Sequence, residues 1–430
     1  MKIQKLIPVV VVTLCVLSSS QAPAVIPSPD GGYPGFTTAE GTKALQNLST
    51  GVGNSGLGWY SLFTNSVGNY NTGVGAGTLA LNTADGNTAI GAGALLSNTT
   101  APGNTATGAL ALLSNSTGSS NTAVGAGSLT ANTTGFRNTA IGSGSLEFNT
   151  IGERNTATGN LALTANIDGS DNTAVGDDAL VTNSHGSFQI AVGKNALAAN
   201  TTANNNTAVG YGALQANTTG NSNIALGMLA GAALTTGDNN IDIGNVGVAG
   251  EAGTIRIGIQ GIQFATYVAG INGATVPSGI SVIVDNNGHL GTFTSSERFK
   301  QDIKAMGQSS EILFGLKPVT FHYTKSIDPI GISQFGLVAE DVEKVNPDLI
   351  VRDKNGKPYS VRYEQVNAML LNEFLKEHRK VQELEATVSE QKKQMQVVMD
   401  RLEEQAAQVQ RVTARIDVVE PTLRVIASGH

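Results

Sequence analysis

The sequence predicts a mostly β fibre, in which three chains share a β-roll or β-solenoid built from short repeats. Three observations predict this fold class. A motif near N-T-A-[VI]-G recurs every 17 residues through the middle of the chain, large side chains are scarce there, and a long heptad pattern follows near the C-terminus. Self-similarity at a fixed period is typical of solenoids and fibres, because each unit buries its apolar face only against its neighbours.

The composition favours a core that is shared between units or chains. Of 430 residues 52 are Gly, and only 5% are aromatic. A single chain with so few large apolar side chains buries too little surface to stabilise an ordinary globular core. The formal net charge is −7 and no Lys/Arg stripe crosses the repeats, so nucleic acid is not an expected partner. The single Cys15 excludes a disulfide framework, and the five His residues lack ligand-like spacing, so we expect neither a metal nor a cofactor.

Residues 1–24 have the pattern of a secretory signal peptide. Lys2 and Lys5 supply positive charge, residues 6–17 are apolar, and Ala22-Pro23-Ala24 resembles a cleavage site. The apolar run of about 12 residues is too short to span a bilayer. No later stretch is apolar enough to do so, and we therefore expect a secreted or cell-surface protein without a transmembrane segment after signal removal.

The repeats occupy residues 54–250, after an N-terminal segment at 25–53. Each unit has a short T-A-V or T-A-I strand, a Gly, a Leu four positions later and a polar Asn/Thr/Gly turn. One Val or Ile, one Leu and some Ala per unit make a thin core for one chain, whereas three chains side by side can share one axis. The units start at Asn54, Asn71, Asn87, Asn104, Asn121, Asn138, Asn155, Asn172, Gln189, Asn206, Asn223 and Asn240.

Two local motifs in the repeats have structural rather than chemical interpretations. The string Gly51 to Gly56 fits G-x-G-x-x-G, but no βαβ unit surrounds it, so it does not indicate a dinucleotide site. N-x-[ST] sequons recur in the turns, where we interpret Asn as serving turn geometry rather than carrying glycan. They lie at Asn47, Asn98, Asn115, Asn132, Asn200 and Asn217.

The chain changes character after the repeats. Residues 251–294 alternate apolar and polar side chains, and Asn287-Gly288 between Val284 and Leu290 predicts a hairpin. We interpret this segment as a β-rich neck. Charge rises sharply from Glu297 onward, which predicts a domain boundary near Ser295.

Residues 367–420 have the pattern of a coiled coil. Six heptads run in unbroken phase, and β-branched Val at three of the six d positions favours a trimer or tetramer over a parallel dimer. We expect Pro421 to end the helix and residues 421–430 to form a tail. The a positions are Val381, Val388, Met395, Leu402, Val409 and Ile416, and the d positions are Leu384, Gln391, Val398, Gln405, Val412 and Val419.

The repeats resemble the head repeats of trimeric autotransporter adhesins, whose motif is close to N-x-x-A-[IV]-G. That resemblance implies a trimeric, left-handed parallel β-roll over residues 54–250. The chain departs from those adhesins in its repeat length and in its C-terminus, which is a long charged helical segment rather than a membrane β-barrel. An autotransporter is therefore disfavoured.

Residues from Ser295 onward resemble the endosialidase-type intramolecular chaperone, an autocleaving domain of phage tail fibres. Ser295, Arg298, Phe299, Lys300, Asp302 and Ile303 match its opening pattern, and Gly336-Leu337-Val338-Ala339-Glu340-Asp341-Val342 and Tyr363 match later motifs. The resemblance implies a small α+β chaperone domain at 295–366. It also implies that Ser295 is a nucleophile, that Lys300 is its base, and that the Thr294–Ser295 bond is cut. Ser296 replaces the Asp that is usual in that family.

The chemistry of this motif is consistent with a single-turnover serine auto-endopeptidase that has no external substrate. The Ser295 hydroxyl is covalently held next to the Thr294 carbonyl carbon, which gives a high effective concentration. Lys300 must be neutral to accept a proton, and a dry setting or a neighbouring cation such as Arg298 favours that form. The alternative is that Ser295 and Ser296 cap a helix while Lys300 is a solvated charge.

These features predict a secreted trimeric fibre with a structural or adhesive role, whose chaperone domain directs assembly and leaves by autoproteolysis. The expected partners are two further copies of the chain and a cell-surface or extracellular ligand. Two alternatives remain open, namely a phage-type tail fibre and a ligand- or ice-binding solenoid.

Overall fold

The computed structural model describes residues 35–271 and 278–427. The predicted signal peptide lies outside the described residues. The chain divides into two compact units, residues 1–269 and 270–430, and each is described by itself below.

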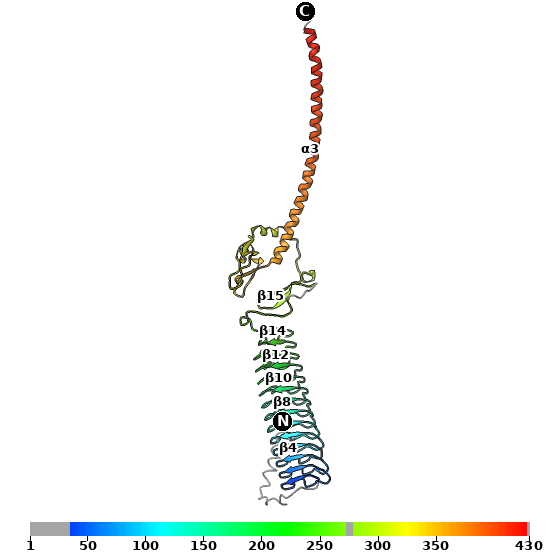
Figure 1. Ribbon diagram of the computed structural model, residues 1–430, viewed down its shortest axis with the longest axis vertical. Coiled ribbons are helices and arrows are strands. Elements are labelled where there is room, and N and C mark those ends of the chain that lie inside the picture. The colour runs from blue at the N-terminus through cyan, green and yellow to red at the C-terminus, as the bar shows by residue number, and fades with distance from the viewer. Residues whose placement is uncertain (1–34, 272–277, 428–430) are drawn as a thin grey trace. The chain divides into compact units, whose positions relative to one another are not determined.

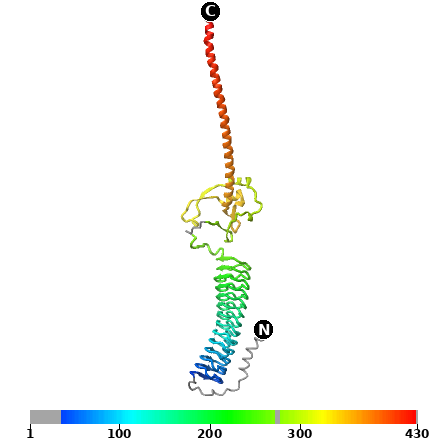
Figure 2. The same cartoon turned by 90° about the vertical axis from the view of Figure 1, so that its right-hand side faces the viewer.

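The first unit is a parallel β-solenoid of fourteen three-residue strands in sequential order (Figures 1 and 2). Neighbouring strands pair in register one unit apart, as Thr122 does with Thr139, so the predicted repeat fold is confirmed. The strands are β1 Thr38–Glu40, β2 Ser55–Leu57, β3 Thr72–Val74, β4 Thr88–Ile90, β5 Thr105–Thr107, β6 Thr122–Val124, β7 Thr139–Ile141, β8 Thr156–Thr158, β9 Thr173–Val175, β10 Ile190–Val192, β11 Thr207–Val209, β12 Ile224–Leu226, β13 Ile241–Ile243 and β14 Ile255–Ile257.

The interior of the solenoid contains Leu and Ala rather than Val or Ile. In β6, Ala123 points inward and is fully buried, while Thr122 and Val124 point outward, as alternation along a strand requires. Each repeat Leu is also buried, and it adopts a left-handed backbone, with φ of 51° at Leu129. That conformation costs about 1–2 kcal/mol, and burying the Leu side chain offsets it with about 1.5–3 kcal/mol.

Asn side chains fill the rest of the interior and form two ladders along the stack. In one ladder the backbone N–H of Asn121 donates to Oδ1 of Asn104 at 2.9 Å. In the other, Nδ2 of Asn132 donates to Oδ1 of Asn115 at 2.8 Å. All sequon Asn residues except Asn47 are fully buried. Their role is therefore to satisfy buried polar groups between rungs, which goes beyond the turn geometry expected from sequence.

A Gly follows the strand in each rung from β1 to β13, and from Gly41 to Gly210 it lies directly on the backbone of the next such Gly. Gly91 has φ of 122°, and a Cβ there would lie 2.6 Å from the carbonyl oxygen of Gly108. Only Gly fits at such a position, because the backbone conformation and the close approach both exclude a side chain.

The second unit begins with an antiparallel hairpin, β15 Val282–Val284 with β16 Leu290–Thr292, which confirms the turn predicted at Asn287-Gly288. A small α+β domain follows, with a core formed by Val342, Leu349, Ile350, Val361 and Val366. Its elements are η1 Glu297–Phe299, η2 Gly307–Gly315, β17 Val319–Phe321 paired with β18 Gln334–Gly336, α2 Ala339–Val345, η3 Pro347–Leu349 and β19 Ile350–Arg352 paired with β20 Pro358–Val361.

Helix α3 spans Tyr363–Ala427 and is 65 residues long (Figure 1). It runs through Pro421, so the prediction that this proline ends the helix is wrong. A proline inside a helix removes one backbone hydrogen bond at a cost of about 3 kcal/mol, and α3 spans Pro421 nevertheless. No helix in the described ranges is long and apolar enough to cross a membrane.

Candidate functional site

Ser295 and Lys300 lie together at the start of the α+β domain. Lys300 Nζ donates a hydrogen bond to Ser295 Oγ at 3.1 Å. The single turn η1 lies between them, closed by bonds from Phe299 N to Ser296 O at 3.1 Å and from Lys300 N to Glu297 O at 2.9 Å. This turn reverses the chain, so that a side chain five residues ahead returns to the serine hydroxyl.

The surroundings of this pair are open in a single chain. Thr294, Ser295 and Lys300 are all exposed. The guanidinium of Arg298 lies over the ring of Phe299, with its Cζ 4.6 Å from the ring centroid. A second chain would have to cover the pair to provide the dry setting that a neutral lysine requires.

The alternative interpretation has two parts, a helix cap at the two serines and a solvated Lys300, and Lys300 is indeed exposed. Ser296 is the N-terminal cap residue of η1, but its side chain makes no capping hydrogen bond. The Ser295 hydroxyl binds Lys300 rather than a backbone N–H of the turn. The two side chains are therefore in contact, and neither serine caps η1 through its side chain.

Tyr363 connects a second part of the motif to α3. Its hydroxyl accepts a hydrogen bond from the backbone N–H of Leu337 at 3.0 Å. Leu337 follows β18 and precedes α2, in which Val342 is buried in the domain core. The segment 336–342 therefore has a structural role: Leu337 binds Tyr363 in the first turn of α3, and Val342 packs in the domain core.

Sequence reasoning missed a buried polar anchor between η2 and α3. Ser310 is fully buried and donates to a carboxylate oxygen of Glu373. It also accepts a bond from Asn372 Nδ2 at 2.6 Å, while Lys376 Nζ donates to Glu373 at 2.7 Å. The Lys376 bond, followed by the Ser310 bond, lowers the pKa of Glu373. This cluster ties the domain to the helix, but the buried Ser310 is not accessible to a substrate.

Asp242 in β13 is a second residue that sequence reasoning missed. It takes the inward strand position that Ala holds in β4 to β12, and it is only 1% exposed. Neither of its oxygens has a hydrogen-bond partner within the described residues. Burial, with a smaller contribution from Glu251, raises the pKa of Asp242 to about 6, although Arg256 on β14 opposes the shift. The sequence could have indicated this residue, because Asp242 stands at the middle strand position where β4 to β12 have Ala.

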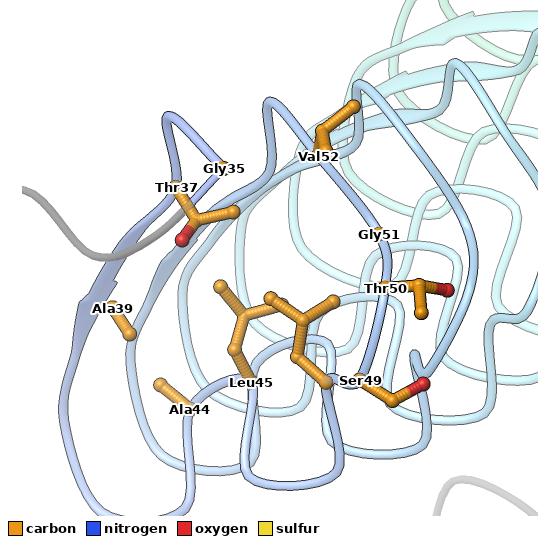
Figure 3. A pocket seen from close by; sticks show the side chains of 10 residues that line it. Gly35, Thr37, Ala39, Ala44, Leu45, Ser49, Thr50, Gly51 and Val52 are labelled. Atoms are coloured by element: carbon orange, nitrogen blue, oxygen red, sulfur yellow. The ribbon is translucent and has the colours of Figure 1, made fainter.

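A cavity of about 550 Å³ opens at the N-terminal end of the solenoid (Figure 3). It lies at the N-terminal end of the described part of the core, beside β1, and Leu45 projects into it. No charged side chain lines it, and it is formed by Gly35, Thr37, Ala39, Ala44, Leu45, Leu48, Ser49, Thr50, Gly51 and Val52. The G-x-G-x-x-G string runs from this cavity into strand β2 rather than into a helix. Within the described ranges, no group of three or more His, Cys, Asp or Glu side chains gathers as a metal site requires.

Comparison with known families finds one match, which begins at Ser295 and includes Lys300. Residues 295–351 match the family described as chaperone of endosialidase. No curated protein and no solved structure matches the chain.

Proposed function

We propose that the chain is a secreted structural or adhesive fibre that assembles as a trimer, because residues 295–351 match the chaperone-of-endosialidase family. Its C-terminal domain directs assembly and is then released by cleavage before Ser295. The main support for a trimer is that successive parts of one chain expose rows of apolar side chains. Exposed apolar surface on this scale marks an interaction site.

The strand face of the solenoid supplies the first row. The third residue of most strands is apolar and points outward, with exposures of 37% at Val74, 42% at Ile141 and 37% at Ile243. The first residue is Thr in most strands and Ile in β10, β12, β13 and β14. Stacked in parallel register, these residues form two continuous columns. Three such faces around one axis would cover the columns and supply the apolar core that a single chain lacks.

Further apolar side chains are exposed after the last solenoid strand in sequence. Phe264 and Tyr267 are 95% and 94% exposed, and Ile271, just past the boundary between the two units, is 71% exposed. In the second unit, Val282, Val284 and Leu290 on the β15–β16 hairpin are each more than 60% exposed. Side chains of this size normally lie in a core, so contact with other copies is the simplest way to bury them.

Helix α3 exposes its heptad positions in the same way. Nine apolar a and d residues are between 46% and 65% exposed on the described part of the helix, namely Val381, Leu384, Val388, Met395, Val398, Leu402, Val409, Val412 and Ile416. A helix with such a stripe is stable in water only when partner helices cover it. A three-stranded coil would align three chains at one end.

The cleavage step follows from the Ser295–Lys300 contact. Lys300, once neutral, takes the proton from Ser295 Oγ, and the oxygen attacks the carbonyl carbon of Thr294. The peptide C–N bond breaks as an ester forms between Thr294 and Ser295 Oγ, and the proton passes to the released amine. Water then hydrolyses the ester to give a Thr294 carboxylate and the free Ser295 hydroxyl. Proximity and an activated hydroxyl are the two requirements for such a step.

Expression of the full chain without added protease tests both parts of the proposal. We expect a trimer that yields the fragments 25–294 and 295–430. Ser295→Ala should stay intact and still trimerise. Lys300→Ala and Lys300→Arg should both fail to cleave, because a guanidinium does not become a neutral base near neutral pH. Ser296→Ala is the matched control and should cleave normally. An intact wild-type trimer, or cleavage at the same bond in Ser295→Ala, would disprove the mechanism.

The outward Thr residues favour one second candidate function. Thr105 and Thr107, and likewise Thr156 and Thr158, flank an inward Ala and point outward from their strands. A regular Thr face is suited to an ordered ligand such as ice, as long as no other chain covers it. Sedimentation equilibrium separates the two functions, because a monomer leaves the face free whereas a trimer buries it.

A further inference from the structure

Three aromatic side chains touch one another near the N-terminal end of the solenoid. The ring of Trp59, the single tryptophan of the chain, lies 4.3 Å from that of Tyr60, centroid to centroid, and the ring of Tyr60 lies 4.7 Å from that of Phe63. In the residues that the structure describes, no other three rings meet in this way. We call Trp59, Tyr60 and Phe63 the aromatic cluster.

The aromatic cluster lies beside the strand face and not on it. Its three residues belong to the turn that follows β2, whereas the outward apolar columns belong to the strands themselves. Trp59 is 36% exposed, and the next rung has only Ala76, Gly77 and Ala80 at the equivalent positions. Contacts between chains through the apolar columns therefore do not account for these rings.

Tyr60 occupies a backbone position at which a large side chain is unfavourable. Its φ is 56°, in the left-handed region, where bulky residues are rare. The equivalent residue is Gly in five later rungs, with φ of 68° at Gly77 and 70° at Gly93, and Leu in three. A rung therefore folds without a ring at this position. A disfavoured conformation that the fold does not require is typical of a residue with a binding role.

A lysine lies against the aromatic cluster. Lys43 Nζ is 4.8 Å from the ring centroid of Tyr60 and 5.8 Å from that of Phe63, so cation–π attraction holds it there. Lys43 is exposed, and it is the only charged residue between positions 41 and 84. It forms no ion pair with any residue in the described ranges. The patch therefore combines flat apolar rings with one positive charge that no described carboxylate neutralises.

A sugar is the ligand class that fits this combination. One face of a pyranose ring carries mainly C–H groups, which stack on aromatic rings, while its hydroxyl groups stay at the edge in contact with water or polar side chains. A protein partner normally buries about 800 Å² on each side, which three partly covered rings do not provide. The ammonium of Lys43 favours a saccharide with a carboxylate, because the two charges are complementary.

We propose that the aromatic cluster and Lys43 bind an acidic polysaccharide. A sugar ring stacks on the cluster at Trp59, and the carboxylate of a uronate unit pairs with Lys43 Nζ. The inference rests on the adhesive role proposed above, to which it gives a ligand class, and it requires neither trimerisation nor cleavage. Because the chain has one tryptophan, the fluorescence of Trp59 reports on this site alone in the full chain.

Titration of the full chain with polygalacturonate tests the proposal. We expect a saturable change in Trp59 fluorescence, and an affinity that falls at high salt because salt screens the charge pair. Polygalacturonate with methyl-esterified carboxyl groups is the matched ligand, since it has the same sugar backbone without the charge. It should bind at least about tenfold more weakly, because the charge-assisted bond to Lys43 is lost.

Two substitutions and a control separate the parts of the site. Tyr60→Gly removes the ring and restores the residue that five later rungs have, so it should fold normally and bind at least about tenfold more weakly. Lys43→Gln should lower the affinity for polygalacturonate to that for the methyl ester. Tyr211 takes the position of Trp59 in a later rung and is 51% exposed. As the matched control, Tyr211→Ala should bind as the wild type does.

The proposal is overturned by the absence of a saturable response, by equal affinities for the two polymers, or by wild-type affinity of Tyr60→Gly. A trimer that Tyr60→Gly weakens, in a chain that does not respond to polygalacturonate, would show that the cluster contacts another copy instead. Sedimentation equilibrium and the masses of the cleavage products test the proposed function separately. A trimeric, cleaved chain that fails to bind polygalacturonate therefore refutes the saccharide site alone.

Discussion

At the scale of single residues, Asp242 gives the last full rung a dependence on pH. Its folded pKa is raised to about 6, whereas an unfolded Asp titrates near 3.9. The folded rung therefore holds the proton more tightly, and stability falls as pH rises from about 4 to about 6. At one pKa unit per 1.36 kcal/mol, the loss is on the order of 3 kcal/mol above that window.

We predict that Asp242→Ala, which restores the residue found in β4 to β12, stabilises this rung at pH 7.5 and removes the pH dependence. Hydrogen exchange of peptides covering residues 224–257, corrected for intrinsic rates, measures local opening at pH 4.5 and 7.5. Asp178→Asn is the control, because this carboxyl is partly exposed. Equal protection of the wild-type rung at the two pH values would refute the prediction.

A second residue-scale prediction concerns the stacked glycines. Gly91→Ala forces a Cβ to within 2.6 Å of the carbonyl oxygen of Gly108, at a φ of 122°. The next rung must move, and we expect the free energy of unfolding to fall by at least about 3 kcal/mol, as it does for other severe backbone conflicts. Gly86→Ala also has positive φ but meets no atom within 4 Å, so it should lose only about 1 kcal/mol. Similar melting temperatures for the two variants would show that the close stacking is unimportant.

At the scale of elements, the rung of 17 residues is the unit of folding. Deleting residues 121–137 removes one complete rung and leaves β5 to stack on β7 with the Asn ladders in phase. Deleting only 121–128 places an Ala/Leu segment where Asn must lie. We expect the first variant to fold and cleave as the wild type does, and the second to lose the regular β signal in circular dichroism. If both deletions behave alike, the rung is not the structural unit.

The long helix gives another prediction at this scale. A peptide covering residues 366–420 should be helical and trimeric, because β-branched Val at d positions disfavours a parallel dimer. Sedimentation equilibrium measures its mass. Replacing Gln391 and Gln405 with Val should raise its melting temperature and broaden its oligomeric state, because polar d residues restrict register at a cost in stability. A stable dimer of the unmodified peptide would contradict this assignment.

At the scale of the whole molecule, the sequence predicts the repeat architecture better than the details inside each rung. The regular spacing of the motif is sufficient to predict parallel pairing of the strands, because every unit pairs with a like unit on each side. It does not determine which strand residue points inward, since a three-residue strand fits either alternation, and only the structure places Ala inside and Val outside. The buried Asn ladders were missed because Asn is also typical of turns. The spacing of Ser295 and Lys300 is consistent with their contact. Ser310 and Glu373, in contrast, are too far apart in the sequence for their contact to be predicted from a single sequence.

The last prediction concerns the whole chain and the consequence of removing its chaperone domain. An array of near-identical rungs folds slowly, because contacts between chains are non-local and slipped registers cost little. If, as proposed, the C-terminal domain and coil align three chains and are then cut off, the separated fibre loses the part that would guide its refolding. The cleaved fibre should therefore owe its persistence to slow unfolding rather than to a reversible equilibrium.

Denaturation in guanidinium chloride followed by dilution measures this difference. Uncleaved Ser295→Ala should refold to trimers in good yield, whereas the purified fragment 25–294 should refold poorly. Ser296→Ala, which retains Ser295 and Lys300, should behave like the cleaved wild type, so the outcome depends on cleavage rather than on substitution in the loop. Before denaturation, the melting temperatures of the cleaved and uncleaved fibres should be similar, because the rungs are the same. Equal refolding of fragment 25–294 and Ser295→Ala would show that the repeats find their register unaided, and the C-terminal domain would then need another explanation.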